Sequence, residues 1–271
     1  MFVCVFGIKI AAIKKNRIIK LFTHIRRIHM IVGLYTGASG MVSQGDYQTV
    51  IARNLANINT IGYKKNVAVF QSYISDTKTE NQNANRGVGN SLGTVATDFS
   101  PGTLEYTGND LDLSIKGNGF FTVKTDDGIR YTRKGQFMLS RDMRIITPEG
   151  WYLLGHDGEI QVPQNAKSIT VKENGSLSAD GKETGKIRVV TISDLTALEP
   201  TGNCAYTLSD TAKEPEDSID FKIAHRYLEQ SNVNAVDEMV NMIANMRGYQ
   251  SGYKVTDSID ETLKKLIKLA T

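Results

Sequence analysis

The chain has 271 residues, of which 40% are hydrophobic and 8% aromatic, enough for one or two domains with a buried core. Its net charge of +3 is uneven, because residues 1–29 hold seven basic residues and no acid, which leaves 25 basic against 29 acidic residues in the remainder. Nucleic-acid binding is therefore not predicted. With only Cys4 and Cys204, the sequence has neither a disulfide framework nor a cysteine metal motif.

Residues 1–29 form a basic, apolar leader. Their apolar run precedes the basic residues, Lys9 interrupts it, and no small-residue cleavage site follows, so the pattern is not that of a secretory signal. The segment is also too short and too charged to span a bilayer. A membrane-surface helix is one interpretation. We favour translated sequence upstream of a true start at Met30.

Residues 30–66 predict an N-terminal helix with one apolar face, interrupted by Gly45. The residues at heptad spacing on this face are Leu34, Ala38, Met41, Gln48, Ala52 and Leu55. The segment closes with the helix-ending residues Asn57, Asn59 and Gly62. Asn54, Asn57 and Asn59 are candidates to cap or bridge adjacent helices, although simple helix termination explains the last two equally well.

Residues 67–92 predict an extended linker or a mobile loop, because the run SDTKTENQNANRG within them is nearly free of apolar residues. From residue 93 to 221 the apolar period changes from helical to alternating, as in short strands. Tight-turn pairs such as Asp127-Gly128 and Asn174-Gly175 separate these strands. The middle of the chain therefore predicts an all-β domain of antiparallel strands.

Residues 222–271 predict a C-terminal helix of about 35 residues, roughly 50 Å long. Its apolar stripe consists of Val236, Met239, Val240, Ile243, Met246, Tyr253, Ile259, Leu263 and Leu266. Asn234 can cap its first amides, and Asp237 and Glu238 suit the positive end of the helix dipole. A helix of this length needs a partner along it.

The two terminal segments and the middle predict an α+β fold. In it, long N- and C-terminal α-helices form a coiled-coil-like layer, and the all-β central domain lies between them in sequence. A pair of ordinary core helices is the alternative that amphipathicity by itself favours. The expected divisions are residues 1–29, 30–66, 67–92, 93–221 and 222–271.

No catalytic, metal or cofactor motif is predicted. The four histidines are scattered without metal-ligand spacing, and no Ser or Cys lies in a nucleophile motif. Gly87-Val88-Gly89 lacks a third glycine, and Gly181-Lys182 is followed by Glu183 where a phosphate-binding loop needs Ser or Thr. The sequence therefore favours a structural or binding role over an enzyme.

Four segments carry a resemblance to a known family. They are MIVGLYTGASGM (Met30–Met41), ARNLANINTIGYKKN (Ala52–Asn66), FSPGTLEYTGNDLDLSIKGNGFFTVKTDDGIRYTRKGQFML (Phe99–Leu139) and LEQSNVNAVDEMVNMIANMRGYQSGYKV (Leu228–Val255). They resemble the signatures of the bacterial flagellar rod and hook proteins, in the family's order. The similarity covers residues 30–269.

The resemblance implies a non-enzymatic subunit of the flagellar basal-body rod, in the periplasm. Such subunits are exported by the flagellar type III apparatus and self-assemble through their terminal helices into a shaft that carries torque from motor to hook. The implied partners are copies of itself, other rod and hook subunits and the export machinery. No cofactor, nucleic acid, small-molecule substrate or stable membrane insertion is implied.

The residues expected at subunit contacts are Leu34, Ala38, Met41, Ala52, Leu55, Asn57, Val236, Val240, Ile243, Met246, Ile259, Leu263 and Leu266. Within the family, the size of the chain and the runs at residues 95–107 and 147–163 most resemble the proximal rod subunit. The distal rod subunit or a hook-like subunit is the alternative inside the family. A secreted β-domain binding module with helical arms is the alternative outside it.

Overall fold

The computed structural model describes residues 33–75, 86–164, 166, 168–209, 212–218 and 221–270. The expectations for the leader and for a start at Met30 lie outside these residues. The chain divides into two compact units. The first comprises residues 1–50, 68–95 and 240–271, and the second comprises residues 51–67 and 96–239.

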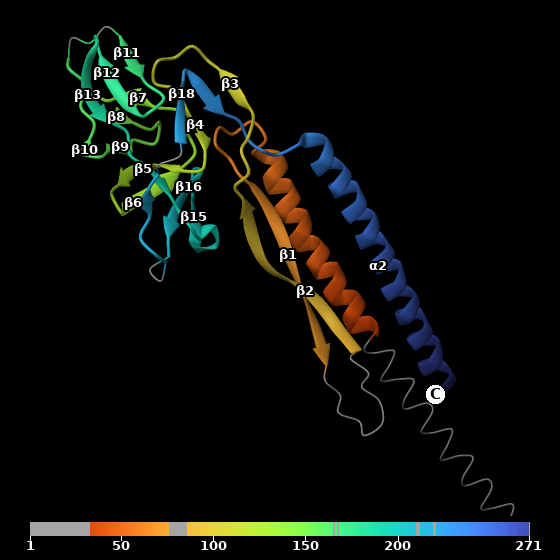
Figure 1. Cartoon of the computed structure of the whole chain (residues 1–271). Helices are drawn as coiled ribbons and strands as arrows, with labels where there is room; N and C mark the ends of the chain where they lie inside the picture. The colour runs from red at the N-terminus through yellow and green to blue at the C-terminus, as the bar shows by residue number, and fades with distance from the viewer. Residues whose placement is uncertain are drawn as a thin grey trace, which may run out of the picture. The chain divides into compact units, whose positions relative to one another are not determined.

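Two α-helices meet in the first unit. One covers residues 33–56 and the other, α2, covers Ala235–Ala270 (Figure 1). A Cβ atom added at Gly37 would meet Thr256 Oγ1 at 2.8 Å, and one added at Gly248 would meet Gln44 Nε2 at 2.7 Å. Because the contact partner moves back along α2 as the first helix advances, the helices are antiparallel. Glycine lets them approach closely.

A two-stranded sheet formed by β1 (Lys65–Ser75) and β2 (Arg86–Asp98) accompanies the N-terminal helix (Figure 1). Within the first unit, Ser43 Oγ donates to the backbone oxygen of Asn90 at 2.8 Å. The rings of Tyr47 and Phe70 meet edge to face, with centroids 5.7 Å apart. These contacts fix the hairpin on the helix.

The predicted fold class, with long N- and C-terminal helices in a coiled-coil-like layer, is wrong. The N-terminal helix is short, ending at residue 56, and paired strands follow it in the region where we expected a linker. The described residues hold only these two α-helices, and the middle of the chain is mostly β-sheet. The helices contact each other through glycine and amide side chains, as in the bonds from Asn245 Nδ2 to Gln44 O and Gln48 Oε1, both 2.9 Å. Met41 and Ile259 also lie at this helix pair, next to Gly252 and Gly33.

The second unit is built of antiparallel sheets. The ten-stranded sheet contains β5 (Phe120–Thr125), β6 (Gly128–Thr132), β7 (Met138–Leu139), β8 (Ile145–Ile146), β9 (Tyr152–Gly155), β10 (Gly158–Glu159), β14 (Val189–Thr191), β15 (Leu198–Gly202), β16 (Ala205–Leu208) and β17 (Glu216–Asp217). The three-stranded sheet contains β11 (Ile169–Val171), β12 (Ser176–Ala179) and β13 (Lys182–Lys186). Two pairs complete the unit: β4 (Leu113–Gly117) with β18 (Phe221–His225), and β3 (Leu104–Tyr106) with β19 (Tyr227–Glu229). A 3-10 turn, η1, covers Leu195–Ala197.

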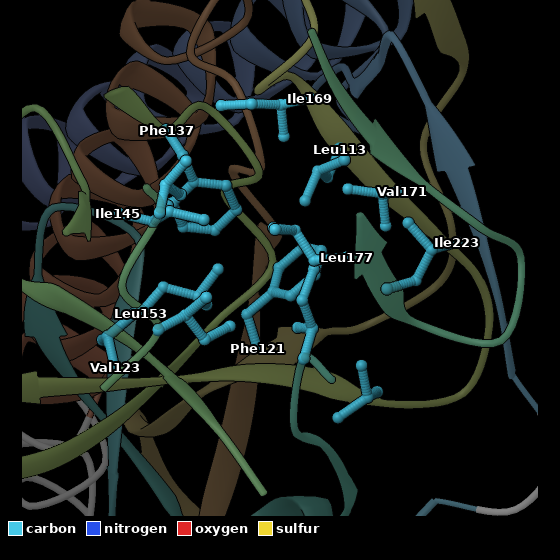
Figure 2. Close-up of a cluster of buried hydrophobic side chains, with 14 of the residues drawn as sticks. Leu113, Phe121, Val123, Phe137, Ile145, Leu153, Ile169, Val171, Leu177 and Ile223 are labelled. Atoms are coloured by element: carbon cyan, nitrogen blue, oxygen red, sulfur yellow. The ribbon is translucent and has the colours of Figure 1, made fainter. Parts of the chain in front are cut away.

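A hydrophobic cluster from several of these sheets forms the main core of the second unit. Figure 2 shows Leu113, Phe121, Leu153 and Leu177 converging in it, and each of them is at most 1% exposed. A second cluster contains Phe120, Tyr131, Val190, Ile192, Leu198 and Tyr206. Because consecutive side chains of a strand point to opposite faces, Phe120 and Phe121 enter different clusters.

Candidate assembly surface

The start of α2 is fixed by its cap. Asn234 Oδ1 accepts a hydrogen bond from the amide of Val236 at 2.9 Å, and Asn234 O accepts one from the amide of Glu238 at 3.0 Å. Asp237 and Glu238 lie in the first turn, where the helix dipole favours negative charge. The predicted cap is confirmed, but the helix begins at Ala235 and not at residue 222, because β18 and β19 occupy the start of the predicted helical segment.

One face of α2 carries exposed apolar side chains, which we name the apolar ridge. The ridge comprises Val236, Met239, Val240, Ile243 and Met246, each between 51% and 67% exposed. At 100° per residue these side chains lie opposite Glu238 and Asn245, which are at most 9% exposed. The first half of α2 is thus covered on one side by this chain and left apolar on the other. A helix that is apolar on an uncovered face favours burial against another molecule.

A buried charge cluster ties distant segments together inside the second unit. Lys64 Nζ donates to Glu229 Oε1 at 2.6 Å and to Ser100 O at 2.7 Å. Arg133 Nη1 lies 3.4 Å from Glu229 Oε2. The side chains of Lys64, Arg133 and Glu229 are 0%, 5% and 1% exposed, so two cations share one carboxylate out of water.

The protonation equilibria of the two cations reflect this burial. Burial lowers the pKa of Lys64, with the charge of Arg133 adding to the effect and the contact with Glu229 opposing it. Burial also lowers the pKa of Arg133, again opposed by Glu229. The Glu229 carboxylate therefore offsets the cost of burying the positive charges of Lys64 and Arg133.

A second polar group joins the end of the N-terminal helix to the start of α2. Asn54 Nδ2 donates to Asn66 O at 2.9 Å, and Asn54 Oδ1 accepts from the amide of Asn66 at 2.9 Å. Asn54 Nδ2 also lies 3.4 Å from Glu238 Oε2. Lys65 Nζ pairs with Glu238 Oε1 at 2.7 Å. Asn54 thus bridges to α2, as one of the two sequence interpretations predicts.

Three family descriptions match the chain. "Flagella basal body rod protein" matches residues 34–64, "Flagellar hook protein FlgE/F/G D1 domain" matches residues 114–179, and "Flagellar basal body rod FlgEFG protein C-terminal" matches residues 224–269.

Whole-length relatives agree with these matches. Flagellar basal-body rod protein FlgG of Bacillus subtilis is 34% identical over 262 residues, which cover 89% of this chain and 99% of the relative. FlgG of Buchnera aphidicola is 30% identical over 264 residues, with 89% and 100% covered. FlgF of Caulobacter vibrioides is 30% identical over 237 residues, with 87% and 96% covered. The chain belongs to the flagellar basal-body rod protein family.

As a rod protein, the chain is a structural subunit of the flagellar basal body that assembles with other rod and hook subunits. The relatives support this function over a secreted binding module. They carry the names of two rod proteins, FlgG and FlgF, and the proximal position stays a prediction.

The charge cluster of the rod protein draws one residue from each of the three matched segments. Lys64 lies in the first matched segment, Arg133 in the second and Glu229 in the third. Each matched segment therefore supplies one charged group to a single buried site. The cluster thus joins the three matched segments within the second unit.

The structure distributes the residues expected at subunit contacts over different environments. The exposed ones are Ala38, Ala52, Val236, Val240, Ile243, Met246 and Leu266, and the partly buried ones are Leu34, Met41, Leu55, Asn57, Ile259 and Leu263. Met41 and Ile259 lie at the helix pair, next to Gly252 and Gly33. Asn57 ends its helix, because its Nδ2 donates to Arg53 O at 2.9 Å. The expected stripe of α2 is therefore divided between an inner face and the apolar ridge.

Sequence reasoning missed the buried polar residues of the rod protein. Lys64, Arg133, Glu229 and Glu238 were not among the expected site residues, although all four lie in the quoted signatures. Among the described residues, no group of His, Cys, Asp and Glu could hold a metal ion. The helices in that part of the chain are also too polar or too short to cross a bilayer.

Proposed function

We propose that the rod subunit acts without catalysis, and that its apolar ridge packs against neighbouring rod-family subunits in the shaft that carries torque from motor to hook. The observation that carries this proposal is the uncovered apolar face at the start of α2. Burying a Val, Ile or Met side chain contributes about 1.5–3 kcal/mol, so half-exposed side chains along one ridge still offer several kcal/mol to an interface.

The N-terminal helix offers further candidates for the same contact. Ala38 and Ala52 are exposed, as are Tyr35 and Val42, which are 63% and 66% exposed. Small and apolar side chains on an exposed helix face suit close packing between subunits. The proposal also includes export of the subunit by the flagellar type III apparatus, without a cleaved signal. It further includes the passage of the rod through the periplasm.

Introducing a charge on the ridge is expected to abolish association while leaving the fold intact. In Ile243→Glu, a carboxylate at a position that is 53% exposed stays hydrated in the free subunit, but it would be desolvated in an interface. We expect association of the purified chain, followed by sedimentation velocity, to weaken at least tenfold. Swimming of cells that carry the variant should be lost. The free energy of unfolding should change by less than about 0.5 kcal/mol.

Val255→Glu is the matched control for this variant. Val255 is 54% exposed on the same helix, but it lies 12 residues from Ile243, about 120° around the helix axis. It should associate and support swimming as the parent chain does. Equal association by both variants and the parent would contradict the proposed role of the ridge.

A further inference from the structure

Only two side chains of α2 are buried among its described residues, and both are polar. Glu238 is 1% exposed and Asn245 is 9% exposed. Because they lie seven residues apart, they point within about 20° of each other around the helix axis. The apolar ridge lies on the opposite side. The helix therefore turns polar side chains toward its own chain and apolar ones outward, which reverses the usual arrangement of an amphipathic helix.

The buried amide of Asn245 is held within the first unit. Asn245 Nδ2 donates to Gln44 O and to Gln48 Oε1, both at 2.9 Å. Gln44 Oε1 is also buried, yet it accepts no hydrogen bond from the described residues. A buried acceptor without a donor costs stability. The face by which α2 meets the N-terminal helix is therefore not the one that burial of apolar surface would select.

The glycines of the helix pair favour the same face. Gly248 and Gly252 lie within about 60° of Asn245 around the axis of α2. A Cβ atom added at Gly248 would meet Gln44 Nε2 at 2.7 Å, and one added at Gly252 would meet Met41 Cγ at 3.3 Å. If α2 turned its ridge inward, large side chains would replace these glycines and hold the helices apart. The Asn245 amide would lose both of its acceptors.

We propose that the contact of Asn245 with Gln44 and Gln48 is a positioning contact for assembly. It sets the rotation of α2 about its own axis, so that the ridge faces outward where a neighbouring subunit reaches it. A polar residue in a helix interface fixes register and orientation at a cost in stability. The assembly role of the contact rests on the proposed function, whereas the rotation is a property of the single chain.

Reversing the polarity of the contact should break it. Asn245→Asp places a carboxylate against two acceptors, Gln44 O and Gln48 Oε1. We expect association of the full chain, followed by sedimentation velocity, to weaken about tenfold. Adding Gln48→Lys supplies a donor to the new carboxylate, so association should return to within about twofold of the parent. Absence of recovery in the double variant would overturn the assigned contact.

An apolar replacement tests the contact without a buried charge. Gln48→Leu removes one acceptor of Asn245 and offers the ridge an apolar surface on its own chain. Its melting temperature should equal or exceed that of the parent, whereas its association should weaken about tenfold. A purely structural role of the amide predicts the opposite pattern, a lower melting temperature with parent-like association.

Thiol labelling measures the rotation of α2 directly. Ile243→Cys reports on the ridge, and Thr256→Cys, about 20° from Asn245 around the axis, reports on the covered face. Both are placed in a chain without its native cysteines and labelled at a concentration at which the parent is monomeric. In the Asn245→Asp and Gln48→Leu backgrounds, labelling should slow at position 243 and become faster at position 256. Faster labelling at both positions, or unchanged labelling, would overturn the inference.

The outcomes separate this contact from the ridge. Loss of association in Ile243→Glu, together with parent-like association in Asn245→Asp and Gln48→Leu, would overturn the positioning contact and leave the proposed function standing. Parent-like association in Ile243→Glu would remove the proposed function and with it the assembly role of the contact. The labelling rates would still decide whether the amide sets the rotation, because they require no association.

Discussion

Replacing Glu229 with Gln is expected to lower the free energy of unfolding by about 3–5 kcal/mol. Glutamine keeps the shape of the side chain but removes the only carboxylate that Lys64 and Arg133 share. Both cations would then be buried without a counter-charge, at 0% and 5% side-chain exposure. Urea denaturation followed by circular dichroism measures the change, and the midpoint should fall without a change in slope.

An exposed ion pair provides the control for this variant. Glu173 Oε2 lies 3.4 Å from Lys222 Nζ, and the two side chains are 73% and 71% exposed. Glu173→Gln should therefore change the free energy of unfolding by less than about 1 kcal/mol. Adding Lys64→Met to Glu229→Gln should recover part of the loss, because one of the two unpaired charges is removed. Equal losses in Glu229→Gln and Glu173→Gln would contradict the importance of burial.

The elements that depend on local pattern could be predicted from the sequence. Asn234 caps α2 as predicted, because a side-chain acceptor ahead of an apolar stripe is a local signal. Strand β5 lies where alternating apolar residues predict it, and Gly128 has the positive φ, 130°, that its turn signal implies. Both signals are complete within a few residues, so no knowledge of the tertiary structure is needed.

The face by which the helices meet could not be predicted in this way. Periodicity weighs apolar side chains, whereas the helix pair uses Gly37 and Gly248, whose contribution is to let backbones approach. The apolar stripe predicted from three- and four-residue spacing is divided, because its first half forms the exposed ridge whereas Ile259 and Leu263 are partly buried. An apolar stripe indicates that a helix has a partner, but it does not say whether that partner belongs to the same chain.

The charge cluster could not be predicted from the sequence, for a different reason. Lys64 and Glu229 are 165 positions apart, and either alone resembles an ordinary surface charge. Only the fold shows that each lies at 0–1% side-chain exposure beside the other. The cluster joins the loop after the N-terminal helix, the β-rich middle and β19 within the second unit, although they come from separate segments.

A methyl group at Gly135 is expected to cost about 3 kcal/mol or more of folding free energy. A Cβ atom there would lie 1.6 Å from Leu113 O and 3.3 Å from Phe121 Cε2. The Leu113 amide also donates to Gly135 O at 2.9 Å, so the two backbones cannot separate without losing this bond. Gly135→Ala should therefore disturb the main core of the second unit. Thermal unfolding of the purified chain should show a melting temperature lower by several degrees, or no soluble chain.

The same substitution at Gly45 should have the opposite sign. Gly45 lies in the N-terminal helix, is exposed, and has no atom within 4 Å of an added Cβ among the described residues. Alanine has a higher helix propensity than glycine, so Gly45→Ala should stabilise the chain by up to about 1 kcal/mol. A lower melting temperature in Gly45→Ala, or an unchanged one in Gly135→Ala, would contradict the assigned backbone approach. Both variants add one methyl group. The difference between their melting temperatures therefore reports how much space the fold leaves around each glycine.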